Sequence, residues 1–366
     1  MDKQRAAVYG TSLEGYRLAL ALASADCEIR VVDERMKASY LLGTKPPKSV
    51  QELLGEDTLY PIQPLSAALQ DADLVVVAPR LRYSDEGKAE WFQRLKEIGQ
   101  NVREKVLMVN LVPMPPGGNR NALKIFSEQA GFGQESYSYA YLPGGSTGSA
   151  AYSGAGDPPG WLSEALGVAE WGRDLELSEL LHIRSVLSSY LPKALDASLY
   201  RDPGPGTTLP STVFLDDLAD GLYELQLLAD TLQHGDALQH YATGALKAAS
   251  GYMKMLESYL RLHARDKGLK AIRSKILIVW GHDPMEMKGE RSRLLGSLLD
   301  SLREVFGEVD TWNPDSSEDD HRRPSSTERY QMVVACSRSD LEVCRSSIRK
   351  APSQAIIGAS VPVQEA

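Results

Sequence analysis

Apolar and polar positions follow one another in three patterns along the chain. Near the N-terminus, short and fully apolar runs alternate with amphipathic segments. Two such runs lie at 71–80 and 104–113, with a helical pattern from Gly87 to Gln100 between them, and another strand is expected at 138–145. Fully apolar runs of this length are typical of strands that helices cover on both faces, as in a parallel sheet. We therefore predict an α/β domain over residues 1–150.

The middle of the chain, residues 151–268, has helical spacing instead. Its apolar residues recur at intervals of three or four, which is the pattern of helices with one apolar face. One segment, RDPGPGTTLP at 201–210, cannot be helical because of its prolines and glycines. We predict a helical region that provides core packing or the interface of a homodimer.

The last stretch, residues 269–366, repeats the first pattern. A strand is expected from Ile276 to Trp280, followed by Gly281, a helix from Arg291 to Phe306 and a strand from Glu308 to Trp312. This order of elements matches that of the first stretch, so we predict a second α/β domain of the same kind. The fold class is therefore α/β, with a helical region between two similar domains.

The most specific motif opens the chain, in RAAVYGTSLEGYRLALALASADCEIRVVDER. An apolar strand ends before Gly10, an amphipathic helix follows, and a second strand ends at Asp33, which lies 23 positions after Gly10. This is the order of a dinucleotide-binding βαβ unit, or Rossmann unit. Glycine permits the tight turn, and the helix start suits a pyrophosphate. The carboxylate can accept hydrogen bonds from both ribose hydroxyls of NAD.

Two residues modify this motif. Ser12 stands where the motif has its middle glycine, and its hydroxyl can donate to a phosphate, while Arg35 could accommodate the extra phosphate of NADP. Ligands of parallel sheets bind beyond the carboxyl ends of the strands, so we expect one crevice there for NAD. The residues expected to bind the cofactor are Gly10, Thr11, Ser12, Leu13, Gly15, Asp33, Arg35, Ala78, Pro79, Asn110 and Pro113.

Composition narrows the classes of function. The 366 residues carry a formal net charge of −9, which argues against nucleic acid and an anionic membrane surface as partners. Cys27, Cys336 and Cys344 have no metal-ligand spacing, so neither a disulfide framework nor a metal site is expected. The sequence shows no basic and apolar leader and no apolar run of membrane-spanning length, which predicts a soluble, cytoplasmic protein.

In four segments the chain resembles the UDP-glucose/GDP-mannose dehydrogenase family of the 6-phosphogluconate dehydrogenase-like superfamily. The segments are Gly10 to Asp33, VNLVPMPPGG at 109–118, DPGPGTTLPSTVFLDDL at 202–218, and 276–314. The resemblance implies NAD as cofactor and a nucleotide-sugar ligand in the C-terminal domain. Family members oxidise a sugar alcohol to a carboxylate through a catalytic cysteine, whose thiolate captures the intermediate aldehyde.

This chain departs from the family at the cysteine. With Pro210 as the point of alignment, Thr208 holds the position of the thiol, and a threonine hydroxyl without a base is a poor nucleophile. The resemblance therefore implies a divergent member that performs at most a single hydride transfer. The family also has a lysine and an asparagine on its first central helix. One placement puts Arg184 and Ser188 there, the other offers Lys193, and only the lysine could act as a base.

A second resemblance concerns LPGGSTGSAAYSG at 142–154, which is similar to the glycine loop of β-hydroxyacid dehydrogenases. That likeness implies that Gly145, Ser146 and Thr147 bind a carboxylate or phosphate, whereas the same composition also fits an interdomain linker. His282 follows a glycine at a predicted strand end, where a nucleotide would lie in the second domain. The candidate substrate-binding residues are Gly145, Ser146, Thr147, Gly206, Thr208 and His282.

Two hypotheses about function follow. The first is an NAD-dependent oxidoreductase that moves one hydride between the cofactor and an alcohol carbon, with Lys193 as its candidate base. The second is a non-catalytic relative that binds a dinucleotide or nucleotide-sugar as a sensor or scaffold. A base within reach of the nicotinamide would favour the first hypothesis, and its absence the second.

Overall fold

The computed structural model describes residues 3–43, 45–55, 62–81, 85–199, 212–232, 236–315, 329–347 and 354–365. The chain forms two compact units. The first comprises Met1–Ser185 and Met285–Gly289, and the second comprises Val186–Pro284 and Glu290–Ala366. Helix α7 (Leu175–Leu199) begins in the first unit and ends in the second. The predicted division into three domains stays a prediction.

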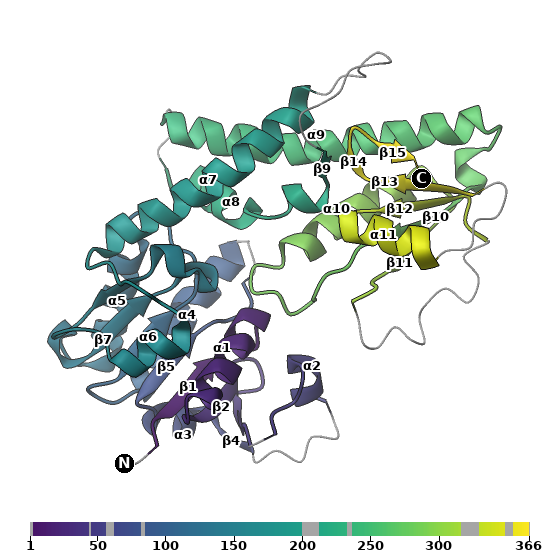
Figure 1. Ribbon diagram of the computed structural model, residues 1–366. Coiled ribbons are helices and arrows are strands. Elements are labelled where there is room, and N and C mark those ends of the chain that lie inside the picture. The colour runs from purple at the N-terminus through teal and green to yellow at the C-terminus, as the bar shows by residue number, and fades with distance from the viewer. Residues whose placement is uncertain are drawn as a thin grey trace. The chain divides into compact units, whose positions relative to one another are not determined.

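The first unit is built on one sheet (Figure 1). Its strand order is β4-β3-β2-β1-β5-β6-β7-β8. Its strands are β1 (Arg5–Tyr9), β2 (Glu28–Asp33), β3 (Ala38–Leu41), β4 (Ile62–Pro64), β5 (Leu74–Val77), β6 (Leu107–Asn110), β7 (Ser138–Tyr141) and β8 (Ala151–Ser153). Pairing is parallel from β2 through β1, β5 and β6 to β7, and antiparallel at both edges. The parallel α/β sheet predicted from the apolar runs is thus confirmed.

Helices cover both faces of this sheet. They are α1 (Leu13–Ser24), α2 (Val50–Leu53), α3 (Leu65–Gln70), α4 (Asp85–Asn101), α5 (Gly118–Ala130), α6 (Gly160–Leu166) and the first part of α7. Alternate residues of β5 enter different cores: Val76 packs in the cluster that contains α1 and α6, and Val77 in the cluster that contains α3, α4 and α5. Burial on both faces explains why the strands read as continuous apolar runs.

The edges of the sheet differ from the expectation. Strands β3 and β4 form an antiparallel addition next to β2, and β8 adds to β7 inside the segment that was interpreted as a glycine loop or linker. Before β8, that segment forms two 3-10 turns, Pro143–Gly145 and Thr147–Ser149. These edge strands are short and mix polar with apolar residues, so they lack the pattern that identifies the central strands.

The second unit has a smaller sheet with the order β11-β10-β12-β13-β15 and a separate pair, β14-β9. Its strands are β9 (Val213–Phe214), β10 (Lys275–Val279), β11 (Glu308–Trp312), β12 (Met332–Ala335), β13 (Ala355–Gly358), β14 (Ser360–Val361) and β15 (Gln364–Glu365). Strands β11, β10, β12 and β13 are parallel, which confirms the second α/β sheet. The helices are α8 (Leu222–Thr231), α9 (Ala237–Asp266), α10 (Glu290–Arg303), α11 (Arg338–Ser347) and the end of α7, with 3-10 turns at Asp216–Leu218 and Ala271–Arg273.

A carboxylate on α7 holds the start of α5, directly after the proline-rich segment that follows β6. Glu179 is fully buried and accepts hydrogen bonds from the backbone N–H groups of Gly117 at 2.6 Å and Asn119 at 2.7 Å. The Asn119 side chain donates to the same carboxylate at 2.8 Å. Burial raises the pKa of Glu179, although these bonds favour its ionised form.

Replacing this carboxylate by an amide tests its role. Glu179→Gln keeps the shape but turns an N–H₂ donor towards backbone N–H donors. We therefore expect the free energy of unfolding to fall by about 1–3 kcal/mol in denaturant titrations. Glu176→Gln is the matched control, because Glu176 lies on the same helix, is partly exposed and pairs with Arg120. That control should cost less than about 0.5 kcal/mol. Equal losses in both variants would contradict the proposed role of Glu179.

Candidate functional site

The first unit has its topological switch point between β1 and β5, because β2 lies on one side of β1 and β5 lies on the other. Gly10 follows β1 here with a φ of +116°, and a Cβ at this position would overlap the Ala78 carbonyl oxygen and lie 2.5 Å from the Pro79 Cα. A Cβ on Gly15 would lie 2.7 Å from the Ala78 Cβ. The turn after β1 therefore packs directly on the end of β5, which only glycine permits.

The start of α1 is capped by the residue that replaces the middle glycine of the motif. Ser12 is the N-cap, and its Oγ accepts a hydrogen bond from the Gly15 N–H at 3.1 Å. The neighbouring Thr11 is 1% exposed, and its Oγ1 has no hydrogen-bond partner among the described residues. A buried hydroxyl without a partner costs free energy, so this position is suited to receive a polar ligand atom.

A short segment from far along the chain crosses this switch point. We call Met285–Gly289 the strap; it belongs to the first unit, although the chain on both sides of it belongs to the second. The Leu13 N–H, after β1, donates to the Met285 carbonyl at 2.7 Å, and the Leu81 N–H, after β5, donates to the Met287 carbonyl at 2.6 Å. In return, the Met287 N–H donates to the Glu14 carboxylate at 2.8 Å.

The strap is anchored by apolar burial as well. Met285 is 7% exposed and Met287 fully buried, and both belong to the core cluster that contains α1 and α6. The sequence analysis did not identify this segment. A faint signal exists, because Met285 and Met287 alternate with the polar Glu286 and Lys288 as in a half-buried strand.

The carboxylate predicted to bind ribose lies at the end of β2 but is engaged locally. Asp33 is 7% exposed, and its Oδ1 accepts hydrogen bonds from the backbone N–H groups of Arg35 at 2.8 Å and Met36 at 3.0 Å. This arrangement is an Asx turn. Arg35 itself is exposed. Asp33 therefore shapes its own turn through one carboxylate oxygen, and its Oδ2 takes part in neither of these bonds.

The other predicted cofactor residues lie at the same end of the sheet. Ala78 and Pro79 are buried against Gly10, and Pro113 is buried after β6. The Asn110 side chain donates to the Tyr139 hydroxyl at 2.9 Å and accepts from the Val112 N–H at 3.0 Å. These bonds fix the chain as it leaves β6.

The described residues that follow β1, β5, β6 and β7 include few groups that could move a proton. In the ranges 10–12, 78–81, 111–116 and 142–146, Arg80 is the one ionisable side chain. A guanidinium stays protonated and cannot act as a base. Arg80 also donates to the Met285 Sδ at 3.2 Å. Gly145, Ser146 and Thr147 are exposed on the two 3-10 turns, whereas Gly206 and Thr208 lie outside the described residues.

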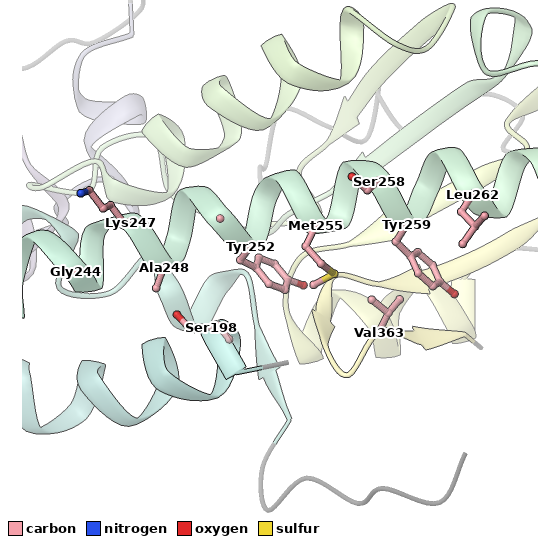
Figure 2. Close-up of a pocket in the computed structure, with 12 residues that line it drawn as sticks. Ser198, Gly244, Lys247, Ala248, Tyr252, Met255, Ser258, Tyr259, Leu262 and Val363 are labelled. Carbon is pink, nitrogen blue, oxygen red and sulfur yellow. The ribbon is translucent and has the colours of Figure 1, made fainter. Parts of the chain in front are cut away.

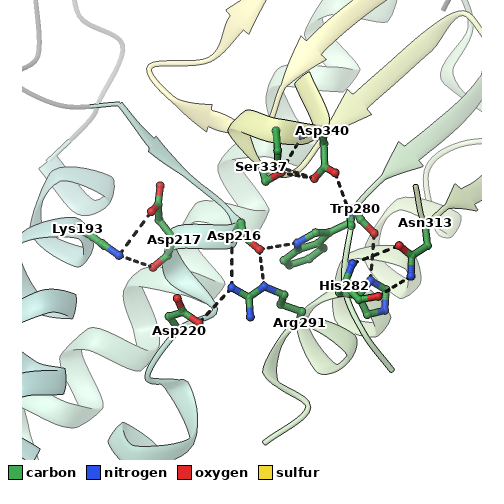
Figure 3. A network of polar contacts seen from close by, with 12 residues as sticks. Lys193, Asp216, Asp217, Asp220, Trp280, His282, Arg291, Asn313, Ser337 and Asp340 are labelled. Carbon is green, nitrogen blue, oxygen red and sulfur yellow. Dashed lines mark hydrogen bonds and ion pairs between the residues drawn. The ribbon is translucent and has the colours of Figure 1, made fainter. Parts of the chain in front are cut away.

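The switch point of the second unit, between β10 and β12, holds carboxylates (Figure 3). Asp340 accepts hydrogen bonds from the Gly281 N–H after β10 at 2.9 Å and from the Ser337 N–H after β12 at 3.0 Å. Burial raises the pKa of Asp340. A Cβ on Gly281 would overlap the Asp315 carboxylate. In a Rossmann unit, a phosphate binds just after the first strand, which is β10 in this unit. Here the acidic side chains of Asp315 and Asp340 occupy that position.

The predicted residues His282 and Lys193 take part in this polar network. The His282 N–H donates to the Asn313 side chain at 3.3 Å, and that amide donates back to the His282 carbonyl at 2.6 Å. The Lys193 ammonium lies 3.5 Å from the Asp217 carboxylate (Figure 3). Asp216 accepts from the Trp280 indole at 2.8 Å and from the Arg291 guanidinium at 2.7 Å.

A groove of about 720 Å³ lies along α9 in the second unit, between that helix, the end of α7 and the residues near β14 (Figure 2). Its lining residues are Ala197, Ser198, Gly244, Lys247, Ala248, Gly251, Tyr252, Met255, Ser258, Tyr259, Leu262 and Val363. Of these residues, Lys247 alone is charged. A lining of mostly small and apolar side chains is more typical of a surface that binds an apolar partner than of a catalytic site.

The structure resembles solved enzymes although the sequence gives no match. No protein-family model and no curated protein matches the chain. A UDP-glucose dehydrogenase from the hyperthermophilic archaeon Pyrobaculum islandicum aligns over 98% of this chain and 94% of its own, with 13% identity and a TM-score of 0.59. The UDP-D-ManNAc dehydrogenase from Pyrococcus horikoshii aligns over 94% and 93%, with 12% identity and a TM-score of 0.56.

The chain has the fold of the UDP-sugar dehydrogenases. A third solved structure, the UDP-N-acetyl-mannosamine dehydrogenase Cap5O from S. aureus, aligns over 91% of this chain and 88% of its own, with 11% identity and a TM-score of 0.51.

Within the described ranges, no helix is long and apolar enough to cross a membrane. Across the same ranges, His, Cys, Asp and Glu side chains form no group that could hold a metal ion.

The close approach at the switch point can be measured with paired glycine variants. Both glycines have a positive φ, which is strained for alanine. Gly10→Ala also makes the new Cβ overlap Ala78, whereas the new Cβ in Gly117→Ala has no described atom within 4 Å. We expect the control to lose about 1–2 kcal/mol of unfolding free energy and Gly10→Ala to lose about 1–3 kcal/mol more. Chemical denaturation measures both. Similar losses would show that the turn does not pack on β5 as described.

Proposed function

We propose that this chain binds a nicotinamide dinucleotide at the switch point of its first unit and acts there as a non-catalytic sensor or scaffold. Three features support binding. The Gly10 turn has the close approach that a pyrophosphate site needs, the first amides of α1 lie next to it, and Asp33 ends the neighbouring strand. The observation that carries the proposal is the Thr11 hydroxyl, which is buried in this turn without a partner in the described ranges.

No base is found among the described residues that follow β1, β5, β6 and β7, and this argues against catalysis. Hydride transfer from an alcohol needs a group that takes the hydroxyl proton. In the described ranges 10–12, 78–81, 111–116 and 142–146, which follow β1, β5, β6 and β7, Arg80 alone is ionisable, and Lys193 is paired with Asp217 in the second unit. In the sequence comparison, Thr208 stands at the position of the family's catalytic cysteine, and this also argues against catalysis. The similarity to UDP-sugar dehydrogenases favours a second candidate function, a single hydride transfer with NAD.

The second unit is a poor candidate for a nucleotide-sugar site. Its switch point holds Asp340 and Asp315, which would repel a diphosphate, and Arg291 is already paired with Asp216 and Asp220. We therefore place the dinucleotide in the first unit and assign no nucleotide-sugar to the second. The substrate-binding roles of Gly145, Ser146, Thr147 and His282 stay predictions, as does the catalytic role of Lys193.

We also propose that the chain forms a homodimer through the groove along α9. Leu262 of α9 lines the groove and is exposed, and α7, which contributes Ala197 and Ser198 to the lining, also exposes Leu195 and Leu199. A second copy of the chain would bury these side chains and fill the open space next to Gly244 and Gly251.

Thr11→Val tests the dinucleotide site by two readouts of opposite sign. The variant removes a buried, unpartnered hydroxyl, so the free protein should keep or gain stability, by up to about 1 kcal/mol. Its affinity for NADH should fall roughly 5- to 30-fold, because one charge-assisted hydrogen bond to the ligand is lost. Thermal unfolding and calorimetric titration with NAD⁺, NADH and NADP⁺ measure both effects.

The wild type provides the reference. A dinucleotide at about 100 times its dissociation constant should stabilise the fold by roughly 2.7 kcal/mol. Incubation with NAD⁺ and UDP-sugars or simple alcohols should produce no NADH absorbance. Steady NADH formation would replace the sensor proposal by the oxidoreductase, whereas the failure of every dinucleotide to shift the unfolding temperature would refute binding.

The dimer is tested by a charge in the groove. Leu262→Glu should convert a dimer to a monomer in light scattering, because a carboxylate would be buried unpaired in an apolar interface. Leu177→Glu, at an exposed leucine of α7 in the first unit, should leave the mass unchanged. A monomeric wild type, or a dimer that persists in the Leu262→Glu variant, would exclude this interface.

A further inference from the structure

We propose that the strap is a displaceable plug of the dinucleotide site: its carbonyl groups hold the backbone donors that a dinucleotide needs, and ligand binding expels it. The inference rests on the proposed function and adds a regulatory step to it. The decisive contact is the hydrogen bond from the Leu13 N–H to the Met285 carbonyl at 2.7 Å. Leu13 is the first residue of α1, so this N–H belongs to the group of helix-start donors that bind a pyrophosphate.

The strap bonds to both sides of the switch point, after β1 and after β5. Its second carbonyl, on Met287, accepts from the Leu81 N–H after β5, and the Gly10 turn after β1 packs against the same strand end. A dinucleotide lies across the switch point, with its two halves beyond opposite strands. The strap and a dinucleotide therefore cannot occupy this place together.

The anchors of the strap are suited to release. Met285 and Met287 are unbranched side chains that adapt to different surroundings, and both are buried in the apolar core of the first unit. A further anchor is the bond between the Met287 N–H and the Glu14 carboxylate. Pro284 precedes the strap, and Gly289 ends it with a φ of +59°, so both ends are marked by residues that interrupt regular structure.

Release of the strap would pull on residues of the second unit, because the chain on both sides of the strap belongs to that unit. Upstream, the chain leads back to Gly281 and β10, whose end is bonded to Asp340. Downstream, the next residue is Glu290, whose carboxylate accepts from the Gly221 and Tyr223 N–H groups at the start of α8. Dinucleotide binding in the first unit is thereby linked through the covalent chain to two polar networks of the second unit.

Competition predicts how affinity depends on the strap. If the strap is in place in most molecules, the ligand can bind only the small fraction in which the strap is displaced. The apparent affinity is then reduced in proportion to that fraction. Met287→Ser removes the most buried anchor, while Met287→Leu keeps its volume and its apolar character. We expect Met287→Ser to bind NADH at least about ten-fold more tightly than the wild type. Met287→Leu should stay within about three-fold of the wild type.

The wild type gives an independent readout that does not depend on a folded variant. Saturating NADH should speed trypsin cleavage of the Lys288–Gly289 bond, followed by mass spectrometry. It should also speed hydrogen exchange at the Leu81 amide, which loses the Met287 carbonyl. The Leu13 amide should stay protected, because a phosphate oxygen replaces the Met285 carbonyl as its acceptor.

The outcomes separate the two proposals. Equal NADH affinities in all three proteins, with Lys288 uncut and Leu81 still protected, would overturn the plug and leave dinucleotide binding intact. No binding by any of the three proteins, including the folded Met287→Ser variant, would refute the proposed function and the plug together. Tighter binding by Met287→Ser, with cleavage at Lys288 that depends on NADH, would support both.

Discussion

Backbone N–H groups at the starts of buried helices must find acceptors, and this constraint shapes both units. The acceptors come from distant parts of the same unit or from the helix itself: the Met285 carbonyl serves α1, Glu179 serves α5, Glu290 serves α8 and Asp340 serves α11. Dehydrogenases of the Rossmann type leave such donors open for phosphates. In this chain, internal groups take them, so the same geometry that could bind a ligand now holds the fold together.

The two switch points meet this constraint in different ways, and the difference decides what each can bind. In the second unit a buried carboxylate bridges β10 and β12, which places negative charge where a diphosphate would have to lie. In the first unit the bridging groups are neutral carbonyls, and the Thr11 hydroxyl beside them has no partner among the described residues. An anion can replace a neutral carbonyl far more readily than it can approach a carboxylate, which is why the proposed ligand site lies in the first unit.

The sequence predicted what depends on local pattern and missed what depends on distant contacts. Strands β5 and β10 were found because burial on both faces leaves a continuous apolar run, and Gly10 and Asp33 because their order along the chain defines the βαβ unit. The strap escaped notice because its own backbone groups bond to residues far away in sequence: Met287 and Glu14 are 273 positions apart. Glu179 gives no such signal, because the helix start that it holds lies 60 positions away in sequence. Ser337 and Asp340 do have the spacing of a capping box, which the sequence analysis did not use.

The N-cap formed by Ser12 has a consequence for how the protein persists in a cell. In an open dinucleotide site, the bound cofactor supplies part of the stability, so the folded fraction follows the cofactor concentration. Here the Ser12 hydroxyl and the strap satisfy the start of α1 from within. The free chain therefore does not need a bound ligand to satisfy these backbone groups, and any stabilisation by a dinucleotide would add to a helix start that is already satisfied.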